Sequence, residues 1–108
     1  MATAIGLTSE ELACLVDNLK NYPAITEAIV YGSRAKGNYH QRSDLDLALK
    51  GVSDRHLLAN LQLALDDSSL PMTVDLLNYN ELSNPALKAH IDRVGISVYP
   101  SSDTGSEK

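Results

Sequence analysis

The feature that most constrains the fold of this sequence is a short stretch, residues 44–49, with a strict two-residue period. Its apolar positions are Leu45, Leu47 and Leu49, and the positions between them are Asp44, Asp46 and Ala48. A period of two predicts a β-strand, because successive side chains point to opposite faces of a sheet. One face is therefore apolar, and the other carries two carboxylates with Cβ atoms about 6–7 Å apart.

Helix and strand patterns surround this stretch in the order helix, strand, loop, strand, helix, strand, helix, strand. Helices are expected over residues 9–22, 54–67 and 85–94, and strands over 25–31, 44–49, 72–77 and 96–99. Thr8 with Glu11 predicts a capping box, Ser53 is an expected N-cap, and Asn84 precedes a proline at the first helical position.

The connection over residues 32–43 is polar, with room for one helical turn but no full crossover helix. The strands on either side of it are therefore expected to pair antiparallel. We expect an α/β (α+β) fold, in which a mixed β-sheet of about four strands has helices packed on it.

Size and charge narrow the class of protein. The 108 residues predict a single domain over residues 1–100, followed by a disordered polar tail over 101–108. The 14 acidic residues outnumber the 9 basic ones, and a net charge of −5 argues against binding nucleic acid through a broad basic surface. One cysteine, no secretory signal and no long apolar run predict a cytoplasmic protein without a membrane segment.

The acidic residues predict a metal site. Asp44 and Asp46 lie on the same side of one strand and repel each other unless a cation sits between them. Asp75 lies in an apolar strand, and it completes a triad if that strand lies beside the first. Mg²⁺ prefers oxygen ligands and substrate phosphates. Three carboxylates, two Mg²⁺ ions and a triphosphate make a two-metal site for nucleotidyl transfer, with Asp75 as general base.

The residues before this acidic strand predict contacts with phosphate. Gly32 has no Cβ, so the backbone there can approach a phosphate closely, and the Ser33 hydroxyl can donate to its oxygens. Arg34, Lys36 and Arg42 add positive charge beside the same loop in an otherwise acidic chain.

Gly32-Ser33, ten intervening residues (34–43) and Asp44-x-Asp46 resemble the signature of the DNA polymerase beta nucleotidyltransferase superfamily. The wording GSRAKG, SDLDLAL and LPMTVDLL resembles its minimal nucleotidyltransferase (MNT) branch, the antitoxins of HEPN–MNT toxin–antitoxin modules. The resemblance covers residues 7–99 and implies a palm-like nucleotidyltransferase fold.

The same resemblance implies roles for individual residues. Gly32 and Ser33 would bind nucleotide phosphates, with Arg34 matching the basic residue that usually follows them. Asp44 and Asp46 would bind Mg²⁺, and Asp75 would be the third carboxylate. The implied activity is transfer of AMP from ATP to a tyrosine of a HEPN-domain toxin, in a homo- or hetero-oligomer.

Other interpretations remain open at this point. The chain could neutralise a toxin by complex formation alone, or modify a small molecule as antibiotic nucleotidyltransferases do, with a partner supplying the acceptor pocket. The aspartates could be solvent-facing strand residues, and Arg34 and Lys36 plain surface charges. A P-loop is a poor fit, because Asn38-Tyr39 follows Gly37 where Lys-Ser/Thr is required.

Overall fold

The computed structural model describes residues 6–37, 44–52, 54–68 and 70–99. Its elements in chain order are α1 (Ser9–Lys20), β1 (Glu27–Tyr31), α2 (Ser33–Lys36), β2 (Leu45–Lys50), α3 (Arg55–Asp66), β3 (Val74–Asn78), the 3-10 helix η1 (Tyr79–Glu81), α4 (Pro85–Val94) and β4 (Ile96–Tyr99). Within this described part, no helix is long and apolar enough to span a bilayer.

The four strands form one mixed sheet in the order β3-β2-β1-β4. β1 pairs antiparallel with both β2 and β4, whereas β2 and β3 run parallel. This arrangement confirms the expected mixed sheet and the antiparallel pairing across the 32–43 connection. It also confirms the condition on which the acidic triad depended, because β3 lies directly beside β2.

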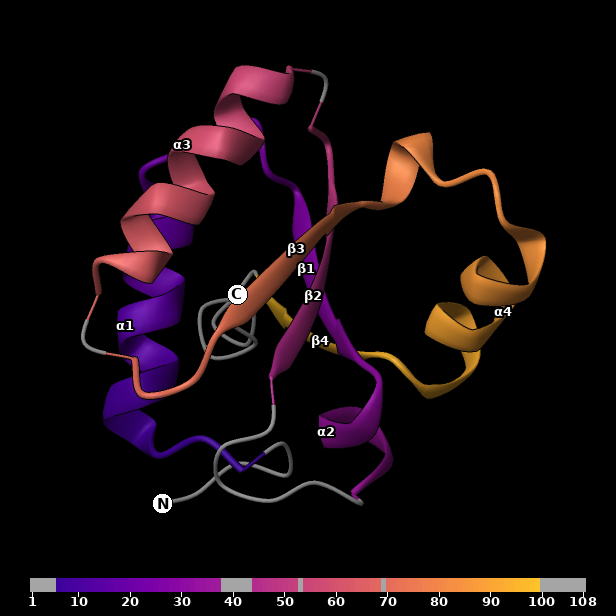
Figure 1. Ribbon diagram of the computed structural model, residues 1–108, viewed down its shortest axis with the longest axis horizontal. Coiled ribbons are helices and arrows are strands. Elements are labelled where there is room, and N and C mark those ends of the chain that lie inside the picture. Colours follow the sequence, from indigo (N-terminus) through magenta and orange to yellow (C-terminus); the bar gives the residue numbers. More distant parts are fainter. Residues whose placement is uncertain (1–5, 38–43, 53, 69, 100–108) are drawn as a thin grey trace, which may run out of the picture.

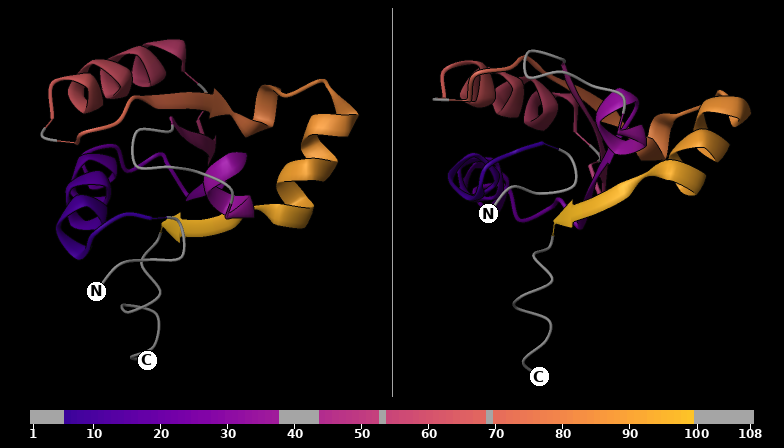
Figure 2. Two further views of the ribbon diagram at one scale, coloured as in Figure 1. Left: turned by 60° about the horizontal axis from the view of Figure 1, so that its bottom comes forward. Right: turned by 90° about the horizontal axis from the view of Figure 1, so that it is seen from below.

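Helices cover the two faces of the sheet unequally (Figures 1 and 2). α1 and α3 lie on one face, where Leu15, Leu19 and Leu61 pack with the leucines of β2 in the main core. α4 lies on the opposite face, where Ile91 packs against Ile29 and Ala48 in a smaller cluster.

The two-residue period of β2 decides which face meets which helices. Leu45, Leu47 and Leu49 are fully buried against α1 and α3, as the alternation predicts. Burying each leucine contributes about 1.5–3 kcal/mol. A register slip of one residue would turn all three toward the other face, so the core holds the intervening aspartates on the α4 side.

Local signals place most helix starts correctly. The Thr8 hydroxyl accepts from the backbone N–H of Glu11, whose carboxylate accepts from the Thr8 N–H, so the capping box is confirmed. Asn84 caps α4 with Pro85 in its first turn. The expected cap at Ser53 is wrong. Asp54 is the N-cap of α3, because its carboxylate reaches the N–H of His56 at 2.9 Å.

Candidate active site

The candidate site lies where three strand ends meet. β1 ends at Tyr31, and β2 and β3 begin at Leu45 and Val74. Because β1 is antiparallel to β2 and β3 is parallel to it, the end of β1 and the beginnings of β2 and β3 fall at one edge of the sheet. α2 follows β1 at this edge (Figure 1).

Register places a phenol and two carboxylates in one row across the sheet. Tyr31 of β1 is the Cα partner of Asp46 on β2, and Asp46 is in turn the Cα partner of Asp75 on β3. Neighbouring strands lie about 4.8 Å apart, so these side chains adjoin one another on the face turned away from α1 and α3. Asp44 precedes β2 by one residue and is on the same side as Asp46 by strand periodicity.

The surroundings of Asp46, the central carboxylate of this row, disfavour its charged form. Burial raises the pKa of Asp46 above its ordinary value, and the charges of Asp75 and then Asp44 raise it further. Asp46 is half-buried, whereas Asp44 and Asp75 are exposed. The structure therefore places Asp46 close enough to Asp75 and to Asp44 for both charges to act on it.

These groups suit a hard divalent cation in kind, since Mg²⁺ takes oxygen ligands and a cation would relieve the repulsion around Asp46. Over the described ranges, however, no three acidic, histidine or cysteine side chains are grouped closely enough to hold a metal ion as they stand. Joint ligation would require the carboxylates to turn toward one another, so the metal-binding role of Asp44, Asp46 and Asp75 stays a prediction.

Gly32 brings the backbone against the central carboxylate. Its φ is +79°, in the left-handed region that favours glycine. A Cβ added at Gly32 would collide with Oδ2 of Asp46. Ser33 then opens α2, and the Lys36 N–H donates to the Gly32 carbonyl at 3.1 Å. Gly32, at the end of β1, and Asp46 on β2 are therefore close in space although they are separated in sequence.

The expected basic residues differ in their environments. Arg34 is buried, with 1% of its surface exposed, so the interpretation of Arg34 as a plain surface charge is wrong. Lys36 is exposed on α2. Arg42 lies outside the described residues. Phosphate binding by Gly32, Ser33, Arg34, Lys36 and Arg42 stays a prediction.

Two residues of this region were not singled out from sequence. Tyr31 is half-buried in the row with Asp46 and Asp75, and its ring meets the ring of His90 on α4 edge-on, with centroids 6.4 Å apart at 83°. The odd-numbered residues of β1 share one face, which would have identified Tyr31 once the pairing of β1 with β2 was known. His90 had no such signal, because its place depends on how α4 packs.

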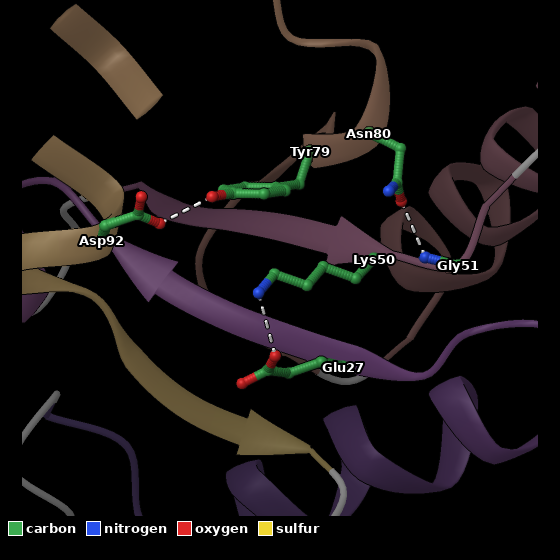
Figure 3. A network of polar contacts seen from close by, with 6 residues as sticks. All are labelled: Glu27, Lys50, Gly51, Tyr79, Asn80 and Asp92. Atoms are coloured by element: carbon green, nitrogen blue, oxygen red, sulfur yellow. Dashed lines mark hydrogen bonds and ion pairs between the residues drawn. The ribbon is translucent and has the colours of Figure 1, made fainter. Parts of the chain in front are cut away.

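A second polar cluster occupies the other end of the same face. Lys50 pairs with Glu27 at 3.3 Å, and the Tyr79 hydroxyl donates to Asp92 at 2.6 Å (Figure 3). The Lys50 ammonium also lies 4.7 Å from the centre of the Tyr79 ring. Lys50 is four residues from Asp46, or about 13 Å along an extended strand. This cluster is therefore separate from the acidic row.

Because its surroundings disfavour the charged form of Asp46, removal of this charge is expected to make the folded chain more stable. With a raised folded-state pKa, stability is greatest below the ordinary value of 3.8 and falls as pH rises through the raised value. In metal-free buffer at pH 7, Asp46→Asn should therefore raise the melting temperature by roughly a few °C. The gain should shrink toward zero as the pH approaches 3.8.

Thermal melts of Asp46→Asn and of Asp17→Asn, on the exposed surface of α1, would check this. The α1 control should change the melting temperature by less than Asp46→Asn does. A lower melting temperature for Asp46→Asn at pH 7 would contradict the electrostatic account.

Comparisons with known proteins identify the family of this chain. The model of the family "Polymerase beta, Nucleotidyltransferase" matches residues 14–104. A protein of Haemophilus influenzae described as "Probable protein adenylyltransferase MntA" is 36% identical over 77 residues, which are 69% of this chain and 68% of that protein.

Solved structures share the fold. A chain from a crystal structure of a toxin–antitoxin with AMP-PNP matches with a TM-score of 0.67 at 22% identity, covering 93% of this chain and 79% of that one. A chain from the tri-AMPylated Shewanella oneidensis HEPN toxin in complex with MNT antitoxin matches with a TM-score of 0.64 at 17% identity, covering 90% and 76%. With the family match over most of its length, this chain belongs to the polymerase beta nucleotidyltransferase family.

Proposed function

We propose that this chain is an antitoxin that transfers AMP from ATP to a tyrosine hydroxyl of a HEPN-domain toxin. The observation that carries the proposal is the row formed by Asp46 and Asp75, with Asp44 beside it and the Gly32 backbone against Asp46. The Haemophilus influenzae relative is described as a protein adenylyltransferase, which supports protein as the acceptor. The fold is shared with a chain from an AMPylated toxin complex.

The proposed reaction assigns a step to each of these groups. The acceptor oxygen attacks the α-phosphorus of ATP, the bond from that phosphorus to the pyrophosphate oxygen breaks, and pyrophosphate leaves. Asp75 is exposed at the end of the row and takes the acceptor proton. Gly32, which has no Cβ, leaves room for the Asp46 carboxylate beside the backbone that leads into α2.

Asp44, Asp46 and Asp75 would hold Mg²⁺, which when bound supplies positive charge that offsets the charge developing on the phosphates. Burial and the charges of Asp75 and Asp44 raise the pKa of Asp46, and a bound cation would offset both effects. Ser33 at the start of α2 and Lys36 on its exposed side are the proposed phosphate contacts at the other end, with Arg34 and Arg42 beside them.

The test is the intact mass of a HEPN-domain toxin that forms a complex with this chain, after incubation with the chain, ATP and Mg²⁺. We expect a gain of about 329 Da for each AMP attached, mapped by peptide sequencing to a tyrosine. The same mixture with EDTA should show no gain. A stable complex with no mass gain under any condition would reject transfer and favour neutralisation by complex formation alone.

A further inference from the structure

Tyr31 lies beside the acidic residues and has no role in the reaction proposed above. It is the last residue of β1, its Cα partner is Asp46, and the next residue along the row is Asp75. At Gly32, the following residue, an added Cβ would collide with Oδ2 of the same Asp46. Tyr31 therefore adjoins Gly32 along the chain and Asp46 across the sheet.

The Tyr31 side chain lies on the same face of the sheet as Asp46 and Asp75, in the row that their register forms. Burial raises its pKa above the ordinary value of 10.0, and the charges of Asp46 and Asp75 raise it further. Its ring is held from the α4 side by the edge-on contact with His90. A tyrosine hydroxyl is protonated at neutral pH even at its ordinary pKa, so Tyr31 can donate a hydrogen bond from this position.

We propose that the Tyr31 hydroxyl donates a hydrogen bond to a non-bridging phosphate oxygen of the bound nucleotide and so positions that phosphate beside Asp46 and Asp75. The assignment rests on the proposed function, since it requires a nucleotide in this site. A neutral phenol cannot act as the general base here, because a tyrosinate beside two carboxylates is disfavoured. As a donor it matches phosphate oxygens, which are hydrogen-bond acceptors.

Tyr31→Phe removes the hydroxyl and keeps the ring against His90. Tyr79→Phe is a matched control, because Tyr79 lies on the same sheet face and donates to Asp92 at 2.6 Å, outside the acidic row (Figure 3). Affinity for AMP-PNP would be measured by calorimetry on the chain, with melting temperatures as the check on folding. Losing a hydrogen bond to a charged group should weaken AMP-PNP binding by Tyr31→Phe about 10-fold or more.

Transfer kinetics with ATP would separate positioning from a structural role. For Tyr31→Phe we expect kcat/KM to fall about 10–100-fold with an unchanged melting temperature, while Tyr79→Phe keeps both AMP-PNP affinity and kcat/KM. AMP-PNP affinity and transfer equal to those of the unmodified chain would overturn the assignment.

The two proposals fail in different ways. If the unmodified chain binds AMP-PNP but transfers nothing, the proposed function fails, whereas a weaker affinity in Tyr31→Phe would still support the phosphate contact. If transfer occurs and Tyr31→Phe behaves as the unmodified chain does in both assays, the phosphate contact alone is rejected.

Discussion

Asp44→Ala/Asp46→Ala is expected to lower the rate of AMP transfer by about 10³-fold or more. The variant removes the half-buried carboxylate at the centre of the row together with its neighbour on the same strand side. Asp75 would remain alone, able to accept a proton but unable to share a cation. The measurement is the initial rate of AMP incorporation into the HEPN-domain partner at saturating ATP and Mg²⁺.

Loss of folding is not a competing explanation for this result. The pKa of Asp46 is raised by burial and by the neighbouring carboxylates, so removing the negative charges relieves repulsion in the metal-free chain. The double variant should therefore melt no lower than the unmodified chain, apart from the small loss of side-chain contacts. A melting curve beside each activity measurement would establish this.

Asp66→Ala/Asp67→Ala provides the matched control. It removes two exposed carboxylates at the end of α3, which packs on the opposite face of the sheet, and it changes the net charge equally. The rate should stay within about twofold of the unmodified chain. If Asp44→Ala/Asp46→Ala retained more than about a tenth of the activity, the acidic row would not be the reactive centre.

The same variants separate the two proposed modes of toxin control. Asp44→Ala/Asp46→Ala removes catalysis but leaves α1, α3 and the main core unchanged. Toxin growth inhibition that is relieved by the unmodified chain and not by this variant would show that transfer is the antitoxic act. Full relief by the variant would show that complex formation suffices.

Local pattern was enough to predict the parts of the site that lie on one strand. The alternation of Leu45, Leu47 and Leu49 with Asp44 and Asp46 predicted both the strand and the face on which the carboxylates lie, because burial of the leucines permits only one register. The helix starts after Thr8 and Asn84 could also be predicted from nearby residues, since each cap depends on a side chain within three residues.

Features that depend on tertiary packing could not be predicted in the same way. Asp75 joins Asp46 only because β3 runs parallel beside β2, with α3 connecting them across one face. Sequence spacing does not determine that strand order. The burial of Arg34 and the contact between Tyr31 and His90 also depend on packing. The 3-10 helix η1 was not predicted, because three residues carry no periodicity.

The placement of Gly32 shows how backbone shape and acid chemistry are combined in one site. The chain leaves β1 through a residue with φ of +79°, and the space where a side chain would lie is filled by Asp46 Oδ2. A larger residue at position 32 would have to displace the carboxylate of Asp46, which is the neighbour of Asp75 across the sheet. The absence of a side chain at Gly32 therefore lets the Asp46 carboxylate lie against the backbone, next to the proposed phosphate contact of Ser33.

Gly32→Ala should for this reason lower AMP transfer by more than about 100-fold and destabilise the fold by about 1–2 kcal/mol. Gly37→Ala is the matched control, because Gly37 has a similar φ of +88°, and among the residues that the structure describes no atom lies within 4 Å of an added Cβ. Both variants carry the backbone strain of an alanine in the left-handed region, whereas only Gly32→Ala collides with Asp46. Comparable loss of stability in the two, with transfer lost only in Gly32→Ala, would attribute the activity to the contact with Asp46. Equal loss of transfer in both would attribute it to backbone strain in the segment, and the space beside Asp46 would then have no special role.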